Sequence, residues 1–152
     1  PVVSNNGKRV AFHTYAVNLG TGATPGEADV VLADLSTGIR TYLSAGAGGG
    51  SSYGPAISAS GKVVVFYSEK STLVTGDGNG TGDVFRHDAA TGALTRLSVN
   101  ALGVEGDGYS YMVPPGLASN GKVLAIASDA GNLADGPADP GVQTDVFLIR
   151  LK

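Results

Sequence analysis

One loop near the middle of the chain carries oxygen-bearing side chains at alternate positions. Its sequence is Asp77-Gly78-Asn79-Gly80-Thr81-Gly82-Asp83. Calcium loops use this alternation because every second side chain points inward, and a glycine permits the sharp turn. The sequence therefore predicts calcium as a possible cofactor, with Asp77, Asn79 and Asp83 as its ligands.

A second interpretation of this loop stays open. Glycine-rich surface loops often contain Asp and Asn side chains that hydrogen-bond their own backbone and bind no ion. Threonine stands at the fifth position of the loop, where an acidic residue would suit calcium better. The corresponding loops of the two other repeats, described below, also differ in their acidic positions. The loop is therefore either a calcium site or a self-bonded turn.

Catalytic patterns are weak in this sequence. Gly50-Ser51-Ser52-Tyr53-Gly54 matches the Gly-x-Ser-x-Gly pattern of esterases, but the sequence predicts neither a buried strand before it nor a helix after it. The only histidines, His13 and His87, lie on or beside predicted strands, and there is no cysteine. We expect no catalytic residue and no transition-metal site, so the chain is predicted not to be an enzyme.

Three tyrosines form a candidate ligand surface. Tyr53, Tyr109 and Tyr111 lie in glycine-rich segments that the sequence predicts to be linkers between repeats. Aromatic side chains at such positions can contribute to a ligand-binding surface. Alternatively, the same side chains pack between neighbouring repeats.

The elements that position these residues recur along the chain. A turn of the type Ser-x-x-Gly-Lys, or a close variant, occurs at residues 4–8, 58–62 and 119–122, so the repeat period is between 50 and 60 residues. Each turn leads into an apolar run, and a later aspartate (Asp29, Asp83 or Asp145) opens a second run. Asp34 and Asp88 precede Thr-Gly turns in the first two repeats. We expect all five aspartates to form turns.

Composition agrees with an all-β protein. The apolar runs are short, rich in Val, Phe, Ile and Leu, and bounded by Gly, Asn, Asp and Ser, which is typical of strands. No segment has sustained helical periodicity, and none has the length of apolar sequence that a membrane span needs. The 10 Lys+Arg residues are scattered and the net charge is −3, which argues against nucleic-acid binding. A repeat period of this length indicates a propeller or a solenoid.

The repeat resembles the TolB-type, WD-like β-propeller repeat of bacterial envelope and secreted proteins. The resemblance rests on Pro-x-(Ile/Val/Leu)-Ser-x-x-Gly-Lys-x-Val-x-Phe, then Asp-Val-Phe, then Asp-x-x-Thr-Gly followed by Leu-Ser. It implies a periplasmic or secreted, non-enzymatic binding or scaffold module that recognises a protein or a glycan. Two alternatives remain, namely a propeller fragment of a prolyl-oligopeptidase-like hydrolase and a calcium-stabilised structural repeat protein.

The predicted fold is a single domain of β-propeller blades spanning residues 1–152. The blades cover residues 1–44, 55–98 and 113–152, each with four antiparallel strands, except that the third lacks its last strand. Three blades leave two sheet flanks open, so we expect half of a six-bladed ring. A second copy of the chain could complete the ring as a homodimer, or the chain could be a fragment of a longer propeller. Residues preceding Pro1 could also supply the missing strand.

Overall fold

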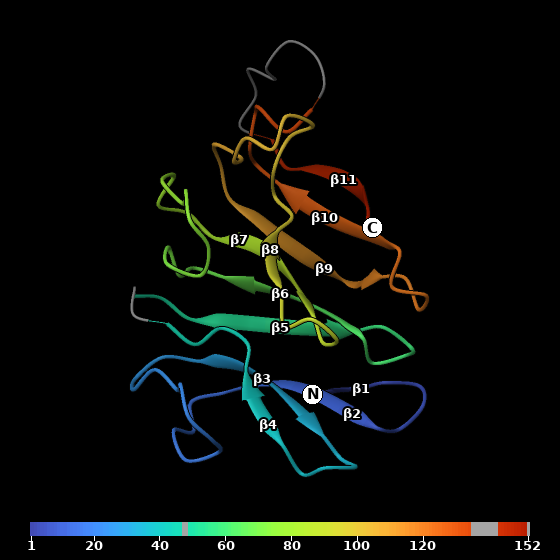
Figure 1. Cartoon of the computed structure of the whole chain (residues 1–152). Coiled ribbons are helices and arrows are strands. Elements are labelled where there is room, and N and C mark those ends of the chain that lie inside the picture. The colour runs from blue at the N-terminus through green and yellow to red at the C-terminus, as the bar shows by residue number, and fades with distance from the viewer. Residues whose placement is uncertain (47–48, 135–142, 152) are drawn as a thin grey trace.

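The structure is a computed structural model, and it describes residues 1–46, 49–134 and 143–151. Within these residues there is no helix, and so none that could span a membrane. Eleven strands form three antiparallel sheets that follow one another along the molecule (Figure 1). The all-β prediction is confirmed.

Each sheet uses consecutive strands. The first sheet contains β1 (Val2–Val3), β2 (Arg9–Thr14), β3 (Asp29–Asp34) and β4 (Arg40–Tyr42). The second contains β5 (Ser52–Ile57), β6 (Val63–Ser68), β7 (Asp83–Asp88) and β8 (Leu94–Arg96). The third contains β9 (Ser110–Leu117), β10 (Val123–Ser128) and β11 (Asp145–Arg150). This strand order is that of up-and-down propeller blades, and the third sheet has three strands, as expected.

Two kinds of predicted turn are confirmed. The glycines between the first and second strands of each sheet, Gly7, Gly61 and Gly121, have φ between 66° and 72°, which favours glycine. Asp34 accepts hydrogen bonds from the backbone N–H groups of the two residues that open the next turn, at 3.0 and 3.2 Å. Asp88 does the same at 2.9 and 3.1 Å. These residues therefore fix the hairpins from local sequence alone.

The second sheet is covered on both faces. Val64 and Phe66 of β6 pack in a core shared with the first sheet, whereas Val65 between them packs in a core shared with the third. Neighbouring β7 divides in the same way, with Phe85 on one side and Val84 on the other. Because successive side chains of a strand point to opposite faces, a strand between two cores must be apolar throughout. This arrangement explains the continuous apolar runs of β6 and the start of β7.

The third sheet ends differently. β11 is also a continuous apolar run, but Val146 and Leu148 are 71% and 75% exposed. The exposed side of β11 is one of the two open sheet flanks that the sequence predicts for three blades. This strand lies at one end of the row of sheets, and the described residues form no further sheet outside it (Figure 1).

The innermost strands start earlier than the sequence indicated. β5 begins at Ser52 and β9 at Ser110, so Tyr53 and Tyr111 lie within strands and not in linkers. A bulge in each strand, between Tyr53 and Ala56 and between Met112 and Leu117, lets an irregular, proline-containing sequence remain paired. An apolar hollow of about 420 Å³ lies where β1, β5 and β9 approach one another.

Candidate functional site

The first two sheets each hold a buried aspartate at the start of their third strand. Asp29 opens β3 and Asp83 opens β7, and both are almost completely buried. In each sheet a serine after the fourth strand donates its hydroxyl proton to the aspartate, Ser44 to Asp29 at 3.1 Å and Ser98 to Asp83. Each serine also accepts the N–H of the residue after that aspartate. Asp145, at the same position of β11, is exposed.

At the first aspartate, the positive charge comes from the neighbouring sheet. Lys70 follows β6, is fully buried, and places Nζ 2.5 Å from Oδ1 of Asp29. The same ammonium donates to the hydroxyl of Thr24 at 2.7 Å and to the carbonyl of Ser44 at 3.0 Å. Glu27 lies further away, at 3.7 Å. Three close acceptors therefore satisfy all three protons of this ammonium group.

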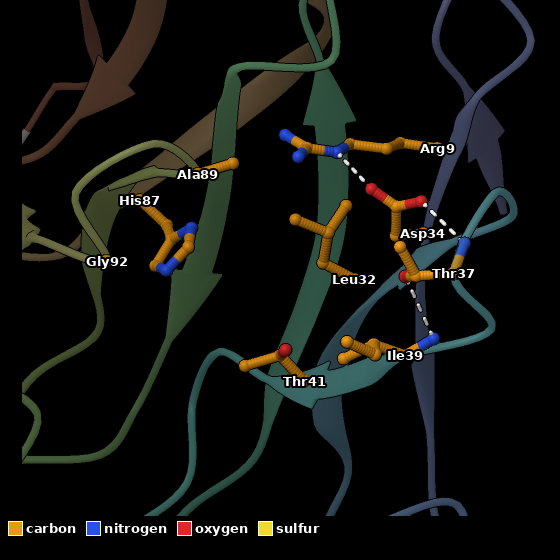
Figure 2. Close-up of a pocket in the computed structure, with 9 residues that line it drawn as sticks. All are labelled: Arg9, Leu32, Asp34, Thr37, Ile39, Thr41, His87, Ala89 and Gly92. Atoms are coloured by element: carbon orange, nitrogen blue, oxygen red, sulfur yellow. Dashed lines mark hydrogen bonds and ion pairs between the residues drawn. The ribbon is translucent and has the colours of Figure 1, made fainter.

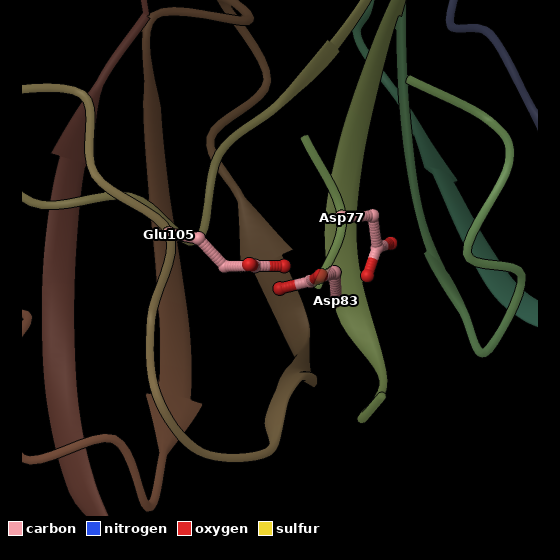
Figure 3. A group of neighbouring side chains, drawn as sticks. All are labelled: Asp77, Asp83 and Glu105. Carbon is pink, nitrogen blue, oxygen red and sulfur yellow. The ribbon is translucent and has the colours of Figure 1, made fainter. Parts of the chain in front are cut away.

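At the second aspartate, a group of three carboxylates surrounds one guanidinium. The group, here called the Asp83 cluster, consists of Asp77, Asp83, Glu105 and Arg96. One oxygen of each acid lies within 4.8 Å of one oxygen of each of the others. Figure 3 shows the three acidic side chains. Nη1 of Arg96 contacts Glu105 and lies 3.1 Å from Oδ2 of Asp83, but 3.8 Å from Asp77. The three acids therefore share one cation.

Burial shapes the electrostatics of this cluster. Asp83 is fully buried and the Asp77 side chain is 2% exposed. Burial and the nearby Asp83 carboxylate raise the pKa of Asp77 to about 6. Burial also raises the pKa of Asp83, against the opposing effects of Ser98 and Arg96. The site thus disfavours negative charge, although three acids meet there.

Of the predicted calcium ligands, Asp77 and Asp83 approach one another, whereas the contacts of Asn79 are with the backbone. Its amide instead holds the loop: Oδ1 accepts from the N–H of Thr81 at 2.7 Å and Nδ2 donates to the carbonyl of Gly106, also at 2.7 Å. Asn79 therefore behaves as the self-bonding interpretation predicts.

Glu105 completes the group and was missed in the sequence. It lies between β8 and β9, where a bridge to Val99 and a turn closed by Asn100 fix its backbone. The carboxylate of Glu105 also accepts the N–H of Gly78 at 3.0 Å. The only local signal is Asn100 followed by Gly103, which indicates a turn but does not say where the next side chain points.

Five of the six tyrosines and one histidine form a series of neighbouring rings across the three sheets, here called the tyrosine band (His13, Tyr15, Tyr53, Tyr67, Tyr109 and Tyr111). Tyr53 contacts His13 edge-on and its hydroxyl lies 3.1 Å from that of Tyr15. Tyr109 contacts Tyr67 at 5.4 Å and Tyr111 at 5.9 Å between ring centroids. Tyr53 and Tyr67 are register partners on adjacent strands, which links the two groups.

The band is partly exposed. Tyr15 is 60% and Tyr109 39% exposed, whereas Tyr67 is nearly buried. The hydroxyl of Tyr67 lies 2.5 Å from that of Tyr109 and 3.1 Å from Oε1 of Glu69. Burial and these partners raise the pKa of Tyr67 above its usual value. The sequence prediction named three of these tyrosines but neither Tyr15 nor Tyr67.

The esterase-like pattern has a structural use. Ser52, its central serine, is fully buried in β5 and its hydroxyl donates to that of Ser68 on β6 at 2.8 Å. Ser110 and Ser128 form the same pair, also at 2.8 Å, between β9 and β10. A hydroxyl used in this way is not presented to a substrate, so the pattern marks a repeated strand contact.

A groove of about 320 Å³ opens between the first and second sheets. Figure 2 shows the residues that line it. Leu32 and Ile39 line it on one side and His87 on the other. Its charged lining residues are already paired, because Nε of Arg9 donates to Oδ2 of Asp34 at 3.1 Å. We interpret this groove as the gap left where two twisted sheets diverge.

Comparisons with known proteins identify the fold. No protein-family model and no curated protein matches the chain. Solved structures do match it. A protein assigned as TolB from Agrobacterium tumefaciens aligns with 98% of this chain at 19% identity and a TM-score of 0.55. TolB from Acinetobacter baumannii aligns with 97% of it at 19% identity and a TM-score of 0.51.

The chain spans less than half the length of these proteins, 44% of the first and 28% of the second. The three sheets, their strand order and these alignments together give the chain a TolB-type β-propeller fold.

Proposed function

We propose that this chain is a non-enzymatic binding or scaffold module that recognises a protein or glycan ligand through the tyrosine band. The band carries the proposal because it joins all three sheets and offers half-exposed rings with hydroxyl groups. Tyrosines suit recognition, since a rigid ring supplies contact area and its hydroxyl supplies a hydrogen bond.

We propose further that the three sheets form half of a six-bladed ring. Val146 and Leu148 of β11, at one end of the row of sheets, are 71% and 75% exposed. Apolar side chains at this end are what stacking against a further blade would cover. A second copy or the remainder of a longer chain would supply the other blades. A periplasmic or secreted location follows from the repeat resemblance.

The binding proposal can be tested with a glycan microarray and a peptide array probed by the labelled chain. A Tyr53→Ser/Tyr111→Ser variant should lose at least about tenfold in affinity for any ligand found, because stacked aromatic anchors dominate such contacts. Ile39→Ser, at an exposed site outside the band, serves as the control. Ligand binding that survives the double variant unchanged would rule out the tyrosine band as the ligand surface.

The ring proposal needs a separate measurement. Light scattering of the purified chain should give a mass of about 30 kDa, twice the 15.1 kDa of one copy, if two copies close the ring. Monomers at all concentrations would exclude the two-copy ring and leave a longer chain as the source of the other blades.

A further inference from the structure

We propose that the Asp83 cluster binds a calcium ion through Asp77, Asp83 and Glu105. Calcium takes oxygen ligands at about 2.3–2.6 Å, so two ligands of one ion can stand up to about 5 Å apart. The three carboxylate oxygens lie within 4.8 Å of one another. Their spacing therefore already allows all three to reach one ion.

The charge of the cluster supports this assignment. Three ionised carboxylates and one guanidinium leave two negative charges without compensation in a site where Asp83 is fully buried. Buried charge that is not compensated is costly. With Arg96 in place, a divalent cation brings the net charge of the cluster to zero, whereas a monovalent cation leaves one negative charge uncompensated.

An unpartnered atom gives independent support. Oδ1 of Asp77 is buried and has no hydrogen-bond partner among the described residues. Only 2% of the surface of this side chain is exposed. Buried polar atoms nearly always have a partner, so an orphaned carboxylate oxygen beside two further acids points to a missing ligand. The hydroxyl of Thr81, in the same loop, is a second buried oxygen for which the described part of the chain offers no hydrogen-bond partner.

The chemistry of the donors favours calcium over other cations. All three are carboxylates, and neither an imidazole nor a thiolate belongs to the group. Zinc and copper prefer nitrogen and sulfur donors, and magnesium demands a near-ideal octahedron. The ligands come from two connections, residues 69–82 with the start of β7 and the segment before β9, which suits the irregular geometry that calcium tolerates.

Two hydrogen bonds hold the two connections together. The N–H of Gly78 donates to Glu105, and the amide of Asn79 donates to the carbonyl of Gly106. The ion therefore reinforces an existing contact and ties the second sheet to the segment that leads into the third. With only three carboxylates in the set, we expect a dissociation constant between about 0.1 and 1 mM.

The test uses the complete 152-residue chain, with calcium chloride as the probe. Thermal unfolding and calorimetric titration are run at about pH 7.5 in chelator, in about 5 mM calcium and in about 5 mM magnesium, with ionic strength matched by sodium chloride. Calcium should raise the unfolding midpoint by several degrees, because an ion that binds only the folded state stabilises it. Magnesium should raise the midpoint much less.

Two variants and one control distinguish a bound calcium ion from the general screening of surface charges by dissolved salt. Asp77→Asn and Glu105→Gln should each weaken calcium binding at least tenfold. In chelator, Asp77→Asn should also unfold at a higher temperature than the wild type, because it removes an uncompensated charge. Asp107→Asn, at an exposed carboxylate near Glu105, should keep the full calcium response.

The proposal is overturned if calcium does not raise the unfolding midpoint of the wild type, or if magnesium raises that midpoint as much as calcium does. It is also overturned if Asp77→Asn binds calcium as the wild type does. Should Glu105→Gln fail to fold, the comparison of Asp77→Asn with Asp107→Asn still decides.

Discussion

Asp29 and Asp83 occupy the same position of successive sheets, yet their positive charges come from different places. Asp29 pairs with Lys70, which reaches across from the second sheet and is fully buried. Asp83 pairs with Arg96 of its own sheet, which two further acids share. The residue that corresponds to Lys70 in the third sheet is Ala130, so no lysine reaches Asp83 from there.

This difference shows how a repeat protein varies its charges while keeping its backbone. The aspartate and its serine partner are part of the strand geometry and recur in both sheets. The strand geometry does not fix the cation, because any long basic side chain that reaches the buried carboxylate can supply the positive charge. In the first site one ammonium faces Asp29 and, at 3.7 Å, Glu27. In the second site one guanidinium faces three acids, and Oδ1 of Asp77 has no hydrogen-bond partner among the described residues.

The largest expected effect tests the first site. Lys70→Met removes the ammonium and leaves Asp29 buried without a cation, which should cost about 3–5 kcal/mol of unfolding free energy. Urea unfolding followed by circular dichroism measures the loss. Lys62→Met, at an exposed position of the same sheet, should change stability by less than about 0.5 kcal/mol. A loss below about 1 kcal/mol for Lys70→Met would mean that Asp29 does not depend on this ion pair.

A somewhat smaller effect is expected at the second site. Arg96→Met in chelator should cost about 2–4 kcal/mol, because Glu105 is 17% exposed and can turn towards water. Adding calcium should stabilise this variant more than it stabilises the wild type, whereas Lys70→Met keeps the Asp83 cluster and should gain only what the wild type gains. Arg40→Met, at an exposed arginine of β4, is the matched control. Equal responses of both variants to calcium would contradict the distinction between the two sites.

The residue before each aspartate gives a third prediction. Ala28 precedes Asp29, but Gly82 precedes Asp83, where an added Cβ would lie 2.2 Å from the hydroxyl oxygen of Tyr67. Gly82→Ala should therefore cost about 1–3 kcal/mol in urea unfolding.

The first sheet also suggests the rescue for that variant. His13 occupies the position there that Tyr67 holds in the second sheet. Gly82→Ala combined with Tyr67→His reproduces the Ala28–His13 combination and should recover about half of the loss. A double variant less stable than Gly82→Ala alone would show that the two sheets differ by more than this pair.

The smallest expected effect concerns pH. His87 of β7 faces the first sheet. Its counterpart in the first sheet, at the same position of β3, is Ala33. Burial lowers the pKa of His87, with Asp88 opposing this effect and Arg9 adding to it. The folded state then binds fewer protons than the unfolded state, so stability is unaffected well above pH 6.5 and falls as the pH drops through that value.

A variant isolates this contribution. The stability difference between wild type and His87→Gln should shift in favour of the variant between about pH 7.5 and pH 5. Urea unfolding at matched ionic strength measures it, and the difference is used because other groups titrate in the same range. A constant difference across these pH values would show that His87 does not couple to folding.

The candidate sites were predictable to different degrees. Asp77 and Asp83 stand in a contiguous motif, so sequence spacing was enough to place them together. Asn79 belongs to the same motif but turns back to its own loop, which spacing cannot reveal because both conformations satisfy it. Glu105 is separated from the others by two strands and reaches them only through the fold.

The sequence by itself determined what short-range chemistry controls. Glycines with positive φ, aspartates that cap the next turn, and apolar runs between them set the strands, their order within each sheet and the repeat. The tertiary structure alone decided which cation reaches which aspartate, which acid completes the cluster, and how Tyr15 and Tyr67 extend the tyrosine band. Apart from the pair of Arg96 with Asp83, which lies within one sheet, those contacts join different sheets or separate connections. They depend on how the sheets stack, and no local pattern of residues encodes that stacking.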